Sequence, residues 1–237
     1  MRLILLSLLL LLSLESKNLV VVAVDAGHTP KRFGTLSATG VKEFDYNYKL
    51  AQMLQIFFKK AYGFNAYLIN SSKKEISLKD RLKEAKEFGA ELFISIHHDS
   101  VQPQFLKRKI LNHQRIYYTN DPKFSGYSIF VSKKNSHFKE SLEIAKAVGE
   151  SLKKSGFKVA TYHSDNVKGE NRKFLARDLG VYQFDDLIVL KYATTPAILI
   201  ETGVIVNEAE ERRVSQDRFK VEFSTAVVRG VAKALNR

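Results

Sequence analysis

The chain has 237 residues, with 38 Lys or Arg against 25 Asp or Glu, which gives it a formal net charge of +13. It contains no Cys, so metal sites built from thiolates and enzymes with a Cys nucleophile are excluded. The positive charge favours a polyanionic partner, such as nucleic acid, anionic lipid or an acidic wall polymer, although solubility alone also explains it.

The first residues, MRLILLSLLLLLSLES, place Arg2 before a Leu/Ile run that continues to Leu14. A basic start followed by a short apolar segment is typical of a secretory signal peptide, and the run is shorter than the roughly 20 residues that span a bilayer. We therefore expect residues 1–16 to be a signal peptide and residues 17–237 to be one domain, exported to the periplasm or cell envelope. A buried N-terminal helix and an uncleaved anchor are the alternatives, since only Ser13 and Ser16 mark a cleavage site.

The first half of the remaining chain alternates apolar runs of strand length with segments of helical spacing. Ser77 and Asp80 match the S-x-x-D capping box, and Gly89 is suited to follow the end of the helix that they open. In chain order the pattern predicts a strand at 19–26, a helix at 43–62, a strand at 64–70, a helix at 78–88 and a strand at 92–96.

Residues 101–125 are irregular, basic and aromatic and include two prolines, so we interpret them as a long loop that forms a lid or contacts glycan. Asn207 and Glu210 form a second capping-box pattern. The other elements expected in the second half are strands at 127–132, 158–163, 187–192 and 197–201 and helices at 142–155 and 219–234. This alternation predicts a single α/β domain with a mostly parallel central sheet flanked by helices.

Three of the predicted strands end on polar side chains: His28 follows the first strand and the small residue Gly27, which permits a sharp turn, while His97 and Glu201 end two later strands. Glu43 opens the helix that follows His28. Ligands in such sheets sit outside the carboxyl ends of the strands. Catalytic Zn²⁺ is held by three imidazole or carboxylate ligands, and a further carboxylate can move the proton of an attacking water. We interpret His28, Glu43 and His97 as ligands of one Zn²⁺ and Glu201 as the catalytic acid–base group.

Each of these residues taken alone has a simpler explanation. A lone His at a strand end is more often a structural hydrogen-bonding group, and a Glu in the first helical turn is favoured by the helix dipole. Glu201 could form an ion pair with one of the many basic residues. No HExxH-type short motif is present, so the interpretation depends on the strand ends lying together.

Four segments in order, VDAGHTP, GVKEFDYNYKLA, ELFISIHHDS and PAILIETGVIVNEAEE, resemble the zinc-dependent N-acetylmuramoyl-L-alanine amidases of the type-3 catalytic-domain class. The resemblance covers roughly residues 19–237 and implies a zinc amidase domain with a phosphorylase/hydrolase-like fold. It implies hydrolysis of the amide between the lactyl group of N-acetylmuramic acid and the L-alanine of the stem peptide. His28, Glu43 and His97 match the zinc ligands of the family, and Glu201 matches its catalytic glutamate.

The sequence also departs from the family pattern. Ala26 and Thr29 stand where Pro and Gly are usual, and His98-Asp99 replaces Ala-Asn after the second His ligand. Adjacent strand residues face opposite sides, so we expect only one His of the pair to bind metal and His98 to be exposed or to contact substrate. Asp25 is expected to orient His28. The candidates for supporting the ligands or contacting substrate are therefore Asp25, Arg81, His98 and Asp99.

Peptidoglycan is the substrate implied by the resemblance, and an activator protein is a candidate partner. Two rival functions remain open: a zinc peptidase that cuts stem peptides, and a non-catalytic wall-binding domain of the same fold. Nucleic acid is not expected as a partner, because the Lys and Arg residues are scattered and no recognisable binding motif is present. No transmembrane segment is expected unless the leader is retained.

Overall fold

Seven strands form one sheet in the order β2-β1-β3-β9-β6-β8-β7 in the computed structural model, which describes residues 19–237. Parallel pairing joins the first four strands of that order, whereas β6 runs antiparallel to β9, and β7 antiparallel to β8. The strands are β1 (Val20–Ala26), β2 (Phe64–Ile69), β3 (Leu92–Asp99), β6 (Ser128–Val131), β7 (Phe174–Ala176), β8 (Val181–Gln183) and β9 (Ala197–Val204). The prediction of an α/β domain with a mostly parallel sheet is confirmed, while the expected signal peptide at 1–16 lies outside the described residues.

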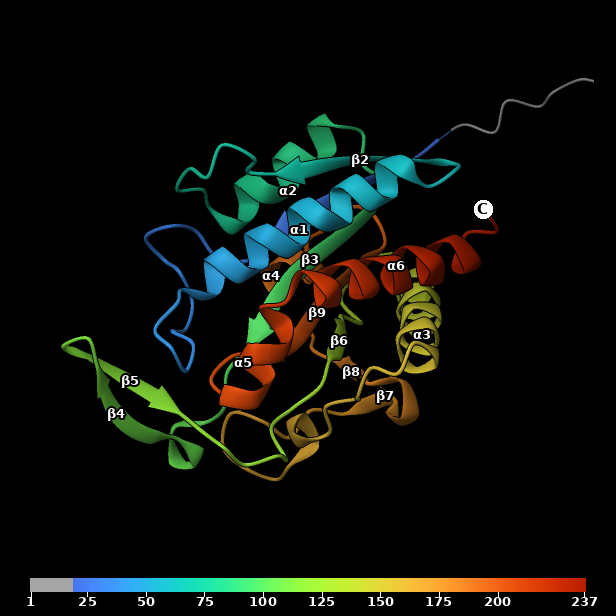
Figure 1. Cartoon of the computed structure of the whole chain (residues 1–237). Helices are drawn as coiled ribbons and strands as arrows, with labels where there is room; N and C mark the ends of the chain where they lie inside the picture. The colour runs from blue at the N-terminus through green and yellow to red at the C-terminus, as the bar shows by residue number, and fades with distance from the viewer. Residues whose placement is uncertain (1–18) are drawn as a thin grey trace, which may run out of the picture.

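Helices cover both faces of this sheet (Figure 1). One face packs against α1 (Glu43–Lys60), α3 (Phe138–Lys154) and α6 (Asp217–Ala234), and the other against α2 (Leu78–Glu87) and α4 (Ile188–Lys191). A further short helix, α5 (Glu208–Val214), follows β9. Because side chains alternate along a strand, Ile94 and Ile96 of β3 pack toward the first face and Phe93 toward the second. Within residues 19–237, none of the helices has the length and apolar character to cross a membrane.

The directions of the strands decide where their ends meet. β1, β3 and β9 are parallel neighbours, so their carboxyl ends lie at one edge of the sheet. The register pairs His97 of β3 with Glu201 of β9, and the antiparallel β6 brings Ser128 opposite Glu201 from the other side. The polar strand endings of the sequence therefore lie together at this edge.

The segment 101–125 is not the irregular loop that we expected. It contains a short 3₁₀ helix (Pro103–Phe105) and an antiparallel hairpin of β4 (Lys107–Leu111) and β5 (Gln114–Tyr118). The two turn residues, Asn112 and His113, both have positive φ angles, of 50° and 62°. A two-residue turn of this kind has a twist that matches the two strands that it joins. The overlooked signal was the Asn at the turn, a residue type that tolerates a positive φ angle.

Two of the predicted strands are wrong. Residues 187–192 contain helix α4, and residues 158–163 contribute only an isolated bridge between Val159 and Tyr127 before a 3₁₀ helix (Tyr162–Ser164). Short apolar runs do not distinguish a strand from a buried helix by periodicity alone. The edge strand β7 and its neighbour β8 have three residues each, and β8 is preceded by another 3₁₀ helix (Arg177–Leu179).

The sequence predicted the starts of two helices, α2 and α5, more accurately than it predicted these strands. Ser77 and Asp80 form the expected reciprocal capping box of α2. Asn207 caps α5 by accepting hydrogen bonds from the backbone N–H groups of Ala209 and Glu210. The Glu210 carboxylate binds Arg213 and the Gly126 N–H instead of returning to the cap, so this second box is only half formed.

Candidate metal centre

His28, Glu43 and His97 converge on one point beyond the carboxyl ends of β1 and β3. His28 Nε2 lies 3.1 Å from Glu43 Oε2, and His97 Nδ1 lies 3.1 Å from Glu43 Oε1. Each residue offers one ligand atom, and these three atoms all lie within 4.8 Å of one another. Two donors on one zinc ion are roughly 3 to 4 Å apart, given zinc–ligand bonds of about 2.0–2.2 Å. Small side-chain adjustments therefore suffice for the three residues to share an ion.

The Glu43 carboxylate is buried and is held in its ionised form. Its Oε2 accepts a hydrogen bond from the Thr35 N–H, and its Oε1 accepts one from Asn47 Nδ2. Burial raises the pKa of Glu43, but hydrogen bonds and charge interactions with His28 and His97 outweigh burial and bring the pKa well below its usual range. A buried anion facing two imidazoles is a suitable ligand set for a divalent cation.

The backbone at the end of β1 is shaped to hold the two imidazoles side by side. His28, not Gly27, has the turned conformation, with a φ angle of 69°. Gly27 is needed for space, because a Cβ there would lie 2.2 Å from Nε2 of His97. A Cβ on Gly34 would lie 2.1 Å from Oε2 of Glu43. Both glycines thus leave room for ligand side chains, and the strained φ of a non-glycine residue is typical of functional sites.

A buried guanidinium fixes the turn that carries His28. Arg81 of α2 donates hydrogen bonds to Asp25 Oδ1 and to the carbonyl oxygens of Ala26 and His28. The other carboxylate oxygen of Asp25 accepts a hydrogen bond from Ser95 Oγ at 2.7 Å. Asp25 therefore acts on His28 through Arg81 and the backbone, and none of its hydrogen bonds among the described residues reaches the imidazole.

Glu201 lies beside the three-residue cluster as the register partner of His97 on the neighbouring strand. Its Oε2 is buried and has no hydrogen-bond partner among the described residues. Burial, together with the nearby carboxylates of Asp99, Glu43 and Glu170, raises the pKa of Glu201 well above its usual range. An unpaired buried carboxylate is costly, and a nearby cation would offset that cost.

His98 does not occupy the exposed position that we expected. The alternation along β3 turns it to the opposite face from His97, where it is buried, and its Nδ1 lies 2.8 Å from Oδ1 of Asn47. Burial lowers the pKa of His98 to about 3, so the ring is neutral. Asn47 also donates to Glu43, so His98 supports a carboxylate of the candidate metal centre through one intermediate side chain.

Asp99 belongs to a buried polar network that the sequence reasoning missed. Its Oδ2 accepts a hydrogen bond from the Tyr162 hydroxyl. The same oxygen lies 3.0 Å from Nε2 of His163, but the angles are not those of a hydrogen bond, so this second contact is mainly electrostatic. The other ring nitrogen of His163 lies 3.0 Å from Oε2 of Glu170. Burial lowers the pKa of His163, but the two carboxylates outweigh burial and raise it to about 9. No short motif joins these residues, since they meet only through the fold.

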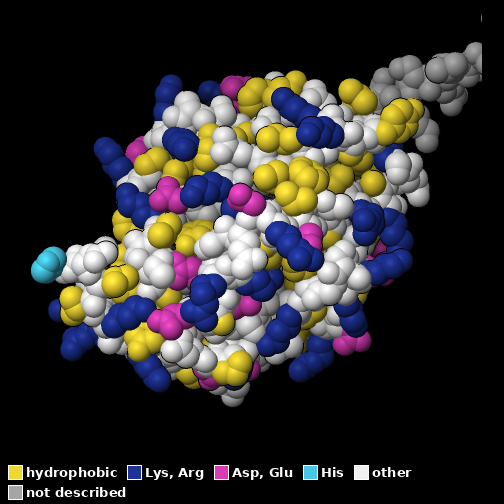
Figure 2. Space-filling model, in the orientation of Figure 1, with side chains coloured by type: hydrophobic (Ala, Val, Ile, Leu, Met, Phe, Trp, Pro, Cys, Tyr) yellow, Lys and Arg dark blue, Asp and Glu magenta, His cyan; other side chains and the backbone are white. Residues whose placement is uncertain are grey.

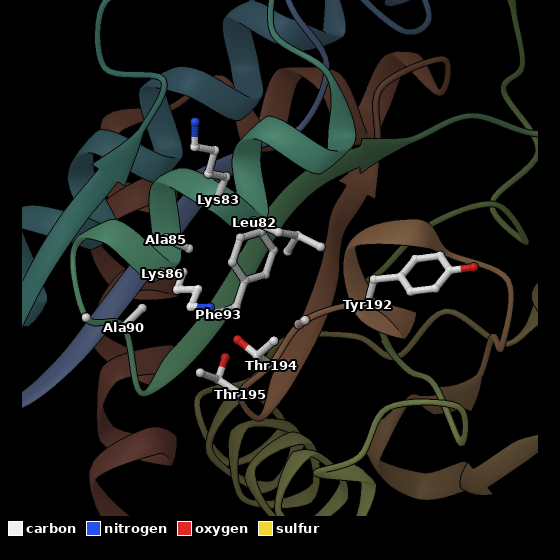
Figure 3. A pocket seen from close by; sticks show the side chains of 11 residues that line it. Leu82, Lys83, Ala85, Lys86, Ala90, Phe93, Tyr192, Thr194 and Thr195 are labelled. Atoms are coloured by element: carbon white, nitrogen blue, oxygen red, sulfur yellow. The ribbon is translucent and has the colours of Figure 1, made fainter.

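A cavity of about 320 Å³ opens beside the cluster. Its polar wall includes His28, His97 and Arg81, and its apolar wall comes from α4 and the neighbouring residues, among them Leu187, Ile188 and Val189. A larger cavity of about 490 Å³, shown in Figure 3, lies between α2 and the residues after α4. It is lined by Lys83, Lys86 and Thr194 and adjoins Phe93 at the other end of β3, so we assign no part of the metal centre to it.

Comparisons by sequence and by structure both find proteins described as N-acetylmuramoyl-L-alanine amidases. A family model described as N-acetylmuramoyl-L-alanine amidase matches residues 22–233. The N-acetylmuramoyl-L-alanine amidase AmiA of Escherichia coli (strain K12) is 25% identical over 221 residues, covering 89% of this chain and 74% of that protein. The crystal structure of an N-acetylmuramoyl-L-alanine amidase from Clostridium difficile 630 is similar with a TM-score of 0.70 at 22% identity, covering 92% of this chain and 98% of that one. The CwlD amidase from Clostridioides difficile, solved in complex with the GerS lipoprotein, has a TM-score of 0.66 at 21% identity, with 92% of this chain and 98% of that one covered.

Proposed function

The chain belongs to the N-acetylmuramoyl-L-alanine amidase family, and we propose that it works as an exported zinc enzyme on peptidoglycan. It cleaves the amide bond between N-acetylmuramic acid and the L-alanine of the stem peptide. The observation that carries the zinc assignment is the convergence of the His28, Glu43 and His97 donor atoms within 4.8 Å, next to the unpaired carboxylate of Glu201.

The residues fit a zinc ion by their chemistry as well as their spacing. Two imidazoles and one ionised carboxylate form a set used by catalytic zinc sites, which keep a further position open. When bound there, zinc supplies Lewis acidity that lowers the pKa of water to about 7 and polarises a carbonyl. The absence of any Cys in the chain leaves imidazole and carboxylate as the available ligand types.

The chain's own residues then divide the work of hydrolysis. Glu201 accepts a proton from the attacking water through its unpaired oxygen and delivers it to the nitrogen of L-alanine as the carbon–nitrogen bond breaks. The products are a free lactyl carboxylate and a peptide with a free L-alanyl amine. Arg81 and Asp25 hold the turn of His28, and the apolar wall at Leu187 and Ile188 limits access of bulk water to the site.

Export to the periplasm or cell envelope remains part of the proposal and is supported by the apolar leader at 1–16 and by the location of the polymer. An activator protein remains a candidate partner, supported by the related CwlD amidase having been solved in complex with a lipoprotein. Of the two rivals, the non-catalytic wall-binding domain predicts an incomplete ligand set, whereas all four residues of the site are present here.

Mass spectrometry of digested peptidoglycan separates these functions. Purified wall fragments are incubated with the zinc-loaded chain, with and without a chelator. The amidase releases an intact peptide that begins with L-alanine and leaves unsubstituted muramic acid, and the chelator stops the release. A stem-peptide zinc peptidase would leave L-alanine attached to muramic acid, and a wall-binding domain would release nothing; either result would reject the proposal.

A further inference from the structure

The β4–β5 hairpin extends away from the body of the domain (Figure 1). Its two faces differ because the side chains of each strand alternate. The register places Arg108 opposite Tyr117 and Ile110 opposite Arg115, and these four side chains form the exposed face, which we call the outer face of the hairpin. Lys109 and Ile116 belong to the other face.

The inner face anchors the hairpin beside the metal centre. Ile116 is 1% exposed and lies next to Gly40, in the loop between His28 and Glu43. Lys109 Nζ forms an ion pair of 2.6 Å with Glu208, at the start of α5 just after β9. The hairpin is therefore fixed to two segments, the loop that leads to Glu43 and the start of α5 after β9. Its outer face keeps a set position relative to the site for this reason.

The outer face is cationic, aromatic and unpartnered. Ile110 is 66% exposed and Tyr117 47% exposed. Within residues 19–237 neither Arg108 nor Arg115 takes part in an ion pair, although many other basic residues do. Figure 2 shows basic and hydrophobic side chains gathered where the hairpin protrudes.

We infer that this outer face docks the uncut part of the peptidoglycan polymer, an inference that rests on the proposed function. Stem peptides carry carboxylates, which the planar guanidinium groups of Arg108 and Arg115 bind in a bidentate manner. The flat ring of Tyr117, between cationic side chains, offers a stacking surface for the apolar face of a sugar ring. The face thus holds a neighbouring repeat of the polymer while the site cuts one amide, which raises the local concentration of substrate.

The test is binding to insoluble peptidoglycan in a Glu201→Gln background, which prevents digestion during the measurement. We compare Arg108→Gln/Arg115→Gln/Tyr117→Ala with the charge-matched control Tyr62→Ala/Lys153→Gln/Arg229→Gln, whose residues are exposed and lie outside the hairpin. The hairpin variant is expected to bind at least tenfold more weakly and to lose part of the salt dependence of binding, whereas the control binds within twofold of the parent. Zinc content and the thermal midpoint of each variant report correct folding, and the single variants Arg115→Gln and Tyr117→Ala should each give a partial loss.

Equal binding of the hairpin variant and the control would overturn the inference. The inference would also be wrong if the triple substitution left peptidoglycan binding intact but abolished binding to vesicles of anionic phospholipid or to a protein partner. A different measurement tests the proposed function, which is wrong if the wild-type chain releases no L-alanyl peptide from soluble wall fragments.

Discussion

His97 of β3 and Glu201 of β9 are direct register partners on neighbouring parallel strands, so their side chains leave the same face of the sheet at the same edge. Glu43 reaches this edge from the first turn of α1, on the opposite face, and His28 reaches it from the turn after β1. One pairing of two strands therefore places an imidazole of the candidate metal centre beside the carboxylate that we propose as the acid–base group.

Replacing Glu201 by Gln should separate metal binding from catalysis. The amide has nearly the same shape but cannot accept the proton of water, so hydrolysis should fall at least about a hundredfold, the lower end of what general acid–base groups contribute. Zinc content, measured by elemental analysis after dialysis, should stay at one ion per chain. His97→Ala is the comparison, since it should lose zinc and activity together. Retained activity in Glu201→Gln would remove the role assigned to this residue.

Gly27→Ala should damage the metal site more than the fold. The new Cβ would lie 2.2 Å from Nε2 of His97, so the imidazole has to move away from Glu43. We expect zinc affinity, measured by competition with a chromophoric chelator, to fall at least tenfold. The apoprotein should retain its circular dichroism spectrum. An unchanged zinc affinity would show that His97 can bind metal from a different position.

Arg81→Ala should be strongly destabilising. The guanidinium is 1% exposed and binds Asp25, so its removal leaves a buried carboxylate without its charge partner, a loss that typically costs about 3–5 kcal/mol. Urea denaturation of the apoprotein measures the change in free energy of unfolding. The exposed Arg229 is the matched control, and Arg229→Ala should change that free energy by less than about 0.5 kcal/mol. Similar changes in the free energy of unfolding for the two variants would contradict the role of Arg81 in fixing the turn that carries His28.

His163 should make folding stability depend on pH in a predictable direction. Its pKa is about 9 in the folded state against an ordinary value of 6.5, so the folded protein binds the proton more tightly than the unfolded chain. The stabilisation, roughly 3 kcal/mol, is fully present below about pH 6.5 and is lost as the pH rises through 9.

The measurement is the difference in free energy of unfolding between the parent and His163→Gln across this pH range. The difference should shrink as the pH rises. A difference that stays constant from pH 6 to 9 would mean that folding does not shift the pKa of His163.

The sequence was sufficient to predict that the candidate residues meet, because each lies near the boundary of an element with a clear pattern. His97 lies near the carboxyl end of the buried strand β3, Glu43 starts α1, and ligands in such sheets sit outside the carboxyl ends of the strands. The same alternation should have indicated that His98 is buried, because the opposite face of β3 is covered by α1 and not by solvent. The contact between His98 and Asn47 depends on how a helix lies over the sheet, which periodicity does not specify.

The rest of the molecule was less predictable for physical reasons. Asp99 is distant in sequence from His163 and Glu170, and only tertiary packing places an imidazole between the two carboxylates. The three-residue strands β7 and β8 are too short to show a period. In the hairpin, Asn112 is a local turn signal, but the strands on either side of it lack the alternation of polar and apolar residues that indicates a strand.

Anomalous diffraction at the zinc absorption edge, from crystals of the zinc-loaded chain, shows whether one ion binds at the proposed site. We expect one strong peak about 2.0–2.2 Å from His28, Glu43 and His97, with the Glu201 carboxylate nearby but not bound to the ion. A peak that lacks any of these three ligands, or one that has Glu201 as a ligand, would contradict this expectation.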